Sequence, residues 1–538
     1  MLRQRDLLIS SLILGLPFLL ARFPWYAFLP VVGITSDTTG YVEAAYAMLN
    51  GEWPLFDFRN PGYPLLLLLP LALGKGLWGV VLMHSLLALG AAVFLVYELR
   101  YLLGKKVVFA ALAMSLFLIS RQQLIHETSV LSDAPFSAAL MALTAMLLKG
   151  IRQRTAGNAL LLATLYTFTL MLRPAAIAFL PVLLIWGFWQ WRKGYPGPHL
   201  LGGAALVLVL ILSLSAYNYR LSGRFGMAGT PAVNRFGATL TYAQAHPDYP
   251  DALNEGLREY QESLAPERLV RLEHAVDPRV VMAIYTEEYE KMWPLIQRTL
   301  ESKKPDGECP TPRLSCVFPE LARVARDAML EHPGLFLRYW GMSFTLSAIR
   351  SRCNWSPDFP DAMKARYLAL SDTDLRWMLD PAPGHNRFLL DRLAIDLHQV
   401  PEHSFSTPRF IRAWYTFQGW LDALLFFNHG LVWTLLTLLA GLYGLFLIVF
   451  RGNRDAILSL MVALSLSWFI YLAMVTMVVY PLERLTYPVE WLRYLAVTSI
   501  ALWLIRENLN QSAVKTSVLH KNHGARTEEH GEGFSASD

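Results

Sequence analysis

Ten long apolar runs constrain the fold of this chain more than any other feature of its sequence. Each run approaches the roughly 20 residues that a helix needs to cross a bilayer, and only 17% of the 538 residues are charged. The runs cover residues 7–29, 77–98, 106–120, 133–149, 156–172, 174–191, 199–217, 428–450, 457–479 and 487–505. The first run has no small-residue cleavage site after it, so we expect it to remain as a signal anchor. The sequence therefore predicts an all-α polytopic membrane protein with about 10–12 transmembrane helices.

Basic residues fall at alternate ends of these runs. The clusters are Arg3/Arg5, Arg100/Lys105/Lys106, Lys149/Arg152/Arg154, Arg192/Lys193, Arg451/Arg454 and Arg506. Lysine and arginine mark the cytoplasmic ends of membrane helices, so ten crossings predict that both termini are cytoplasmic. The net charge of +5 could also suit nucleic acid, but the basic residues lie beside apolar runs rather than on one soluble face. We therefore expect no nucleic-acid partner.

Charged and proline-rich segments divide the chain into four parts. We expect an N-terminal transmembrane module at 1–217 with its first outside loop at 33–76, a mainly helical extracytoplasmic domain at 218–427, C-terminal transmembrane helices at 428–507, and a disordered cytoplasmic tail at 508–538. Two more apolar stretches cover residues 63–73 and 334–349. If either one alone crossed the membrane, it would reverse the orientation of the predicted spans that follow it. Both are predicted to be interfacial or re-entrant.

All three cysteines lie in the predicted extracytoplasmic domain. Cys309 and Cys316 are separated by six residues that include two prolines. An oxidising compartment would favour a disulfide between them, which leaves Cys353 unpaired.

Asp37 is the acidic residue that most suggests chemistry. It lies in the segment Thr35–Tyr41, in the first outside loop directly after the first apolar run. An inverting sugar transfer needs one carboxylate to take the proton from the acceptor hydroxyl, so Asp37 is the candidate general base. Asp133 and Glu127, near the second outside loop, are further catalytic candidates. A structural interpretation stays open, because Asp37 and Asp133 each precede a helical pattern and suit a helix N-terminus.

Arginines at the outer ends of two runs would suit a phosphate leaving group. Arg173 follows the run 156–172, and Arg484 lies between the last two runs. A guanidinium fork stabilises a phosphate without protonating it. Tyr63 and Tyr487 are further candidates for binding a lipid-linked donor. Alternatively, such arginines only extend toward lipid headgroups, and such aromatic residues only anchor in the membrane interface.

His126 and Glu127 are candidate ligands of a divalent cation, and this is the weakest of the predicted roles. Two adjacent ligands do not make a coordination shell, so a bound cation is an alternative rather than the main expectation. His84, inside a predicted span, is expected to make a hydrogen bond within the helix bundle rather than to bind a metal.

These motifs, in this order and spacing, resemble the GT-C superfamily of membrane glycosyltransferases. The similarity is to bacterial relatives of the protein O-mannosyltransferases, glycosyltransferase family 39, and of the lipid A aminoarabinose transferase. It runs through Ser36-Asp37, Pro61-Gly62-Tyr63-Pro64, Glu127, Leu131 to Phe136, Leu172-Arg173-Pro174, Asn218, His332-Pro333, Glu483-Arg484 and Tyr487-Pro488. It thus covers nearly all of the membrane part.

The resemblance implies a GT-C type fold, a polyprenyl-phosphate-linked sugar donor, an outside-facing site and a first-loop aspartate as base. Those roles fall on Asp37, Arg173 and Arg484. Protein mannosyltransferases have an acidic pair in this loop, whereas Asp37 is followed by Thr38, which weakens the expectation of a protein acceptor.

The sequence therefore predicts a polyprenyl-phosphate-sugar-dependent glycosyltransferase in the bacterial cytoplasmic membrane. Its site would face the periplasm and transfer sugar to an envelope glycan, lipid or protein. A lipid flippase or transporter is the first alternative, although we expect few ionisable residues besides His84 in the predicted spans. An envelope glycan ligase with His126 as base is the second.

Overall fold

The computed structural model confirms that the chain is an all-α membrane protein. It describes residues 4–28, 36–54, 56, 59–73, 76–222, 225–227, 229–263, 265–303, 314–349, 409–424, 430–451, 455–477 and 487–507. These ranges are almost entirely helical and contain no strand. The GT-C type of fold stays a prediction.

The membrane part is built from helices that coincide with the predicted apolar runs and from a few others. Those that coincide with the runs are α1 (Gln4–Phe28), α4 (Gly76–Leu103), α5 (Val107–Ile119), α7 (Asp133–Arg152), α8 (Ala156–Leu172), α9 (Leu180–Arg192), α10 (Gly197–Ser222), α21 (Gly430–Phe450), α22 (Ala456–Thr476) and a final helix within Tyr487–Glu507. The others are α2 (Ser36–Leu49), α3 (Gly62–Ala72), α6 (Arg121–Thr128) and α20 (Arg409–Leu424).

Seven of the described helical segments are long and apolar enough to cross a membrane. The predicted runs 77–98 and 106–120 form one apolar segment, Gly79–Ile119, in which Gly104 takes a positive φ of 58°. The runs 7–29 and 156–172 appear as the shorter apolar helices Leu8–Phe23 and Ala156–Leu172. All ten predicted runs therefore coincide with apolar helices, while the count of ten crossings stays a prediction.

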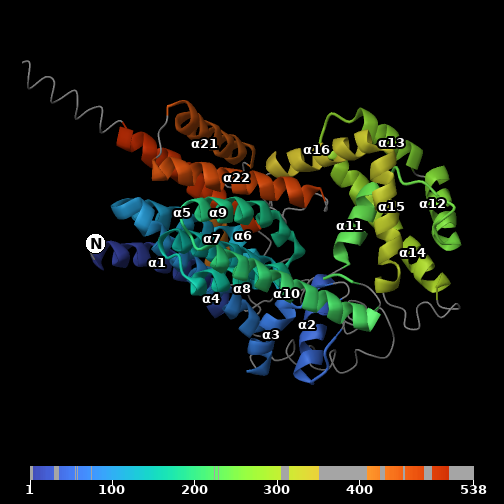
Figure 1. Cartoon of the computed structure of the whole chain (residues 1–538), viewed down its shortest axis with the longest axis horizontal. Coiled ribbons are helices and arrows are strands. Elements are labelled where there is room, and N and C mark those ends of the chain that lie inside the picture. The colour runs from blue at the N-terminus through green and yellow to red at the C-terminus, as the bar shows by residue number, and fades with distance from the viewer. Residues whose placement is uncertain are drawn as a thin grey trace, which may run out of the picture.

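Helix α1 buries one face against its neighbours and leaves an apolar face exposed. On α1, Leu14, Phe18 and Ala21 are buried at helical spacing. The opposite face of α1 exposes Leu8, Leu12, Leu16, Leu19 and Leu20. Figure 1 shows α1, α4, α7, α8 and α10 packed side by side, and α21 beside α22. Exposed apolar faces of this kind suit contact with lipid tails.

Helices between residues 230 and 349, within the predicted extracytoplasmic domain, form a second helical body at the right of Figure 1. We call it the extracytoplasmic body after that prediction. Its helices are α11 (Thr230–Thr239), α12 (Asp251–Ser263), α13 (Ala265–His274), α14 (Val280–Ser302), α15 (Phe318–Glu331) and α16 (Pro333–Ile349). They are amphipathic, and α15, for example, buries Leu321, Val324, Ala325 and Ala328. This body has its own hydrophobic core, separate from that of the membrane helices.

Helix α16 joins the two bodies and contains the apolar stretch 334–349. The indole of Trp340 donates a 3.0 Å hydrogen bond to the carbonyl of Ala473 in α22. Near the end of α16, Arg493 of the final helix donates a 3.1 Å hydrogen bond to the carbonyl of Ala348. A cation at a helix C-terminus is favourable, so this contact fixes the end of α16.

Several predictions fall outside the described residues. Cys316 is disulfide-bonded, but its partner lies outside them, as do Cys309 and Cys353, so the Cys309–Cys316 pairing stays a prediction. The tail 508–538, Arg484 and the whole segment 350–408 lie outside them as well.

Glu288 is an ionisable residue in the core of the extracytoplasmic body. Its side chain is fully buried on α14 and accepts hydrogen bonds from Thr241 and, at 3.3 Å, from Tyr260. Burial raises the pKa of this carboxyl from 4.5 to about 8, although the hydrogen bonds and nearby Arg268 oppose the shift. Glu288 is therefore protonated in the folded protein at neutral pH.

Replacing Glu288 by glutamine should flatten the pH dependence of unfolding. The folded state keeps a proton that the unfolded chain releases, so this group's contribution to stability is complete below pH 4.5 and is lost as the pH rises through about 8. We expect the apparent unfolding temperature of the parent protein in detergent to fall across this interval, and that of Glu288→Gln to fall less.

Glu287→Gln is the matched control. Glu287 is half-exposed, and its pKa is lowered because hydrogen bonds from Arg268 and Arg271 outweigh the effect of burial. It titrates below the same interval, so its replacement should leave the slope unchanged. Equal slopes for the parent and Glu288→Gln would show that no proton is held at Glu288.

Candidate functional site

Two ion pairs bring together three of the predicted site residues. Asp37 lies in the first turn of α2, and the Arg59 guanidinium is 2.6 Å from its Oδ1 atom. Asp133 begins α7 and is paired with Arg173, which directly follows α8. The side chains of Asp37 and Arg59 are 21% and 20% exposed, Arg173 is 14% exposed, and Asp133 is 2% exposed. Each candidate aspartate thus has an arginine partner that a ligand could reach.

Tyr41 connects these two ion pairs. Arg59 donates a 3.2 Å hydrogen bond to the Tyr41 hydroxyl, and its guanidinium lies 4.6 Å from the centre of the Tyr41 ring. The same hydroxyl is 3.3 Å from the hydroxyl of Ser132, which precedes Asp133. The candidate site is therefore the cluster of Asp37, Arg59, Tyr41, Asp133 and Arg173.

The segment Asn60–Gly62, which follows Arg59, packs against the end of α8, which precedes Arg173. The Asn60 side-chain amide donates a 2.7 Å hydrogen bond to the carbonyl of Leu170, near the end of α8. A Cβ at Gly62 would lie 2.4 Å from the carbonyl carbon of Met171, closer than real Cβ contacts allow. Glycine is therefore required for α3 to begin against the end of α8, beside Arg173.

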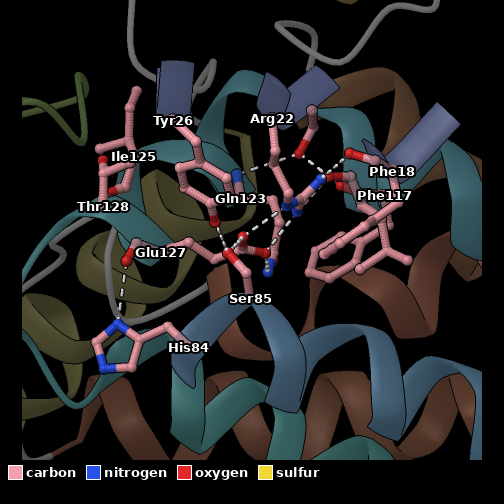
Figure 2. Close-up of polar contacts among 12 residues, drawn as sticks. Phe18, Arg22, Tyr26, His84, Ser85, Phe117, Gln123, Ile125, Glu127 and Thr128 are labelled. Carbon is pink, nitrogen blue, oxygen red and sulfur yellow. Dashed lines mark hydrogen bonds and ion pairs between the residues drawn. The ribbon is translucent and has the colours of Figure 1, made fainter. Parts of the chain in front are cut away.

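Glu127 is placed in a buried network rather than in this cluster. Its two carboxylate oxygens accept hydrogen bonds from Arg22 at 2.8 and 2.6 Å, and also from Ser85 and Gln123. Arg22 and Glu127 are each 1% exposed, and Figure 2 shows them converging from α1 and α6. This placement favours an anchoring role over the catalytic and metal-binding roles predicted for Glu127.

The structure offers little support for a metal site at His126. The His126 ring stacks on Tyr487 with 4.0 Å between ring centres. Among the residues that the structure describes, no group of three or more histidine, cysteine, aspartate or glutamate side chains could hold an ion. His126 and Glu127 thus gain no third ligand of these types within the described part of the chain.

Tyr63 and Tyr487 are fully buried, so neither lines an open surface. The Tyr487 hydroxyl donates a 2.5 Å hydrogen bond to Gln123. The Tyr63 hydroxyl lies 3.1 Å from Nε2 of His84, whose Nδ1 lies 3.1 Å from the carbonyl of Glu127. A carbonyl can only accept, so Nδ1 of the neutral ring carries the proton and Nε2 accepts from Tyr63. His84 therefore makes hydrogen bonds within the bundle, as predicted.

The sequence interpretation missed both Arg22 and Arg59. Arg59 could have been found from its position next to Asn60-Pro61-Gly62, and Arg22 from its place inside an apolar run. The view that the predicted spans hold few ionisable residues besides His84 is wrong. Apolar helices also bury Arg22, Glu98, Glu490 and Arg493. Arg484 lies outside the described residues, so its predicted role stays a prediction.

Gly62→Ala should destabilise the protein, because the added methyl group meets backbone atoms that cannot move aside independently. Overpacking of this kind costs about 1–3 kcal/mol. We expect a lower apparent unfolding temperature in detergent. Gly90→Ala in α4 is the control, because a Cβ at Gly90 meets no atom within 4 Å. Similar unfolding temperatures for the two variants would contradict the close approach of α3 and α8.

The comparisons with protein-family models, curated proteins and solved structures found no match for this chain. The glycosyltransferase resemblance therefore stays a prediction.

Proposed function

We propose that this protein is an integral membrane glycosyltransferase that moves a sugar, with inversion, from a polyprenyl-phosphate donor to an extracytoplasmic acceptor. The single observation that carries this proposal is the pairing of Asp37 with Arg59 and of Asp133 with Arg173 around Tyr41. One accessible carboxylate and two accessible guanidinium groups are the charges that such a reaction needs.

Asp37 is the best candidate for the general base. Inversion needs a carboxylate that reaches the acceptor hydroxyl and takes its proton as the new glycosidic bond forms. The Asp37 side chain is 21% exposed, whereas those of Asp133 and Glu127 are 2% and 1% exposed. Only Asp37 among the three candidate acids therefore offers substantial surface to an acceptor.

Arg59 and Arg173 would receive the phosphate of the donor. Phosphate accepts hydrogen bonds and carries negative charge, so it is best held by guanidinium forks. When the donor phosphate binds Arg59, it would replace Asp37 as the partner of Arg59. The Asp37 carboxylate could then accept the proton of the acceptor hydroxyl. Asp133 would keep Arg173 oriented, because it is buried beside it.

The apolar faces of the membrane helices suit the polyprenyl tail. Each CH₂ group buried from water contributes about 0.8 kcal/mol, so the tail stays in the bilayer and presents its phosphate at the interface. We place the protein in a bacterial cytoplasmic membrane, with the site facing the periplasm and both termini in the cytoplasm.

The extracytoplasmic body would contribute to acceptor binding. It carries a surface cleft of about 590 Å³, whose lining includes Asp248, Tyr249, Asp251, Lys303, Glu320 and Arg323. Carboxylate and basic groups in one cleft can both accept hydrogen bonds from hydroxyl groups and donate to them. Such a lining suits a hydroxyl-rich envelope glycan or lipid headgroup.

Asp37→Asn should abolish sugar transfer while leaving the fold intact, because asparagine keeps the shape of the side chain and cannot take a proton. The measurement is release of polyprenyl phosphate from a panel of polyprenyl-phosphate sugars by purified protein in the presence of envelope extract. Loss of one general base typically costs about 10²- to 10⁴-fold in rate.

Glu259→Gln is the control for Asp37→Asn. It removes an acid of another arginine pair, since Glu259 is 2.9 Å from Arg298 on the surface of the extracytoplasmic body. We expect parent-like release from this variant. Parent-like release from Asp37→Asn would disprove the assignment of the base. No release from well-folded parent protein with any donor would favour the flippase or ligase alternatives.

Arg173→Lys should raise the KM for the donor by about 10-fold. Lysine keeps the positive charge, but it lacks the guanidinium fork that would bind the phosphate and that Asp133 orients. Steady-state kinetics with the active donor measure the effect. Arg298→Lys, in the surface pair with Glu259, should leave the KM unchanged. An unchanged KM for Arg173→Lys would remove Arg173 from the donor site.

A further inference from the structure

The Glu127 hub is a buried network outside the candidate site, formed by Arg22, Ser85, Gln123 and Glu127 from α1, α4 and α6 (Figure 2). Arg22 holds both carboxylate oxygens, which is the strongest geometry for such a pair. The first helix of the chain is thereby joined to a residue 105 positions away.

Stability alone does not explain a charge pair at this place. Arg22 also donates to the carbonyls of Phe18 at 3.2 Å and Leu118 at 2.9 Å, so the cation is well supplied with acceptors. Even so, well-packed apolar residues often match or exceed the stability of a buried ion pair. A buried pair can instead fix one arrangement of its neighbours.

Two hydrogen-bonded arms leave the hub toward the candidate site. In the first, the carbonyl of Glu127 orients His84, which accepts from Tyr63. In the second, Gln123 donates to the Glu127 carboxylate and accepts from Tyr487. Each arm thus ends on a buried tyrosine whose proton direction is fixed.

Tyr63 packs against the candidate site, and the segment that begins with Tyr487 packs on α7, the helix that Asp133 begins. Tyr63 packs edge-on against Tyr41, with 4.8 Å between ring centres. Tyr63 and Tyr487 both lie within electrostatic range of Asp133. A change in either ring would therefore reach Tyr41 or Asp133 without touching a ligand.

We propose that Arg22 is a positioning residue that acts through Glu127. It fixes Tyr63 and Tyr487, and these hold Tyr41 and Asp133 in the geometry that the candidate site requires. The catalytic consequence rests on the proposed glycosyltransferase function, whereas the positioning itself can be measured without any substrate.

The first experiment places 3-fluorotyrosine at position 487 in the full-length purified protein and records its ¹⁹F resonance. Arg22→Gln and Gln123→Leu should each shift or broaden this resonance. Gln123→Leu removes the second arm, and Arg22→Gln releases the Glu127 carboxylate on which that arm is anchored. Tyr26→Phe is the control, because it removes the hydrogen bond to Ser85 and leaves both arms intact. An unchanged resonance in folded Arg22→Gln or Gln123→Leu would overturn the positioning role.

The second experiment is a double-mutant cycle that combines Arg22→Gln with Tyr487→Phe and measures polyprenyl phosphate release. Arg22→Gln should lower kcat by about 10-fold relative to the parent, while the donor KM changes by less than about twofold. In the Tyr487→Phe background, the same substitution should lower kcat by less than a further factor of about three. If Arg22→Gln folds poorly, Arg22→Lys is used in its place. This variant keeps the positive charge and should have a kcat between those of Arg22→Gln and the parent. Tyr26→Phe should keep the parent kcat.

The outcomes separate the two proposals. Multiplicative losses in the cycle would overturn the coupling between Arg22 and Tyr487. If the parent releases no polyprenyl phosphate with any donor, the proposed function fails, and the ¹⁹F result alone supports or overturns the positioning role.

Discussion

The contact between Arg22 and Glu127 is the interaction on which the arrangement of this helix bundle most depends. An isolated ion is very costly in an apolar interior, so each of these groups requires the other in place. That requirement ties α1 to α6, and the carbonyl of Leu118 ties the same guanidinium to α5. Helices that share only apolar surfaces could slide past one another, whereas a bidentate ion pair permits one register.

The candidate site follows the same physical rule with less burial. Asp37 and Asp133 each lie beside an arginine, but their pairs keep enough exposure for a ligand to compete for the cation. The buried pair at Glu127 therefore suits a fixed support, and the partly exposed pairs suit an exchange of partners. This difference in exposure, rather than the identity of the residues, separates an anchor from a reactive group.

The extracytoplasmic body is held to the membrane helices by polar contacts along α16. The Trp340 indole and the Arg493 guanidinium bind backbone carbonyls, whose positions depend on the helices and not on the surrounding side chains. Contacts of this kind tolerate sequence change on either side. They also hold the second helical body in a defined position relative to the bundle.

The sequence by itself determined the helical class and the positions of the apolar helices. Those features depend on local composition and period, which each segment carries regardless of its neighbours. It also located Asp37, Asp133 and Arg173, because charged residues at the ends of apolar runs stand out. Only the tertiary structure decided which charges meet. Arg59 pairs with Asp37, and Arg22 pairs with Glu127 in a buried network. Such pairing depends on which helix faces pack together, and a linear pattern does not contain that information.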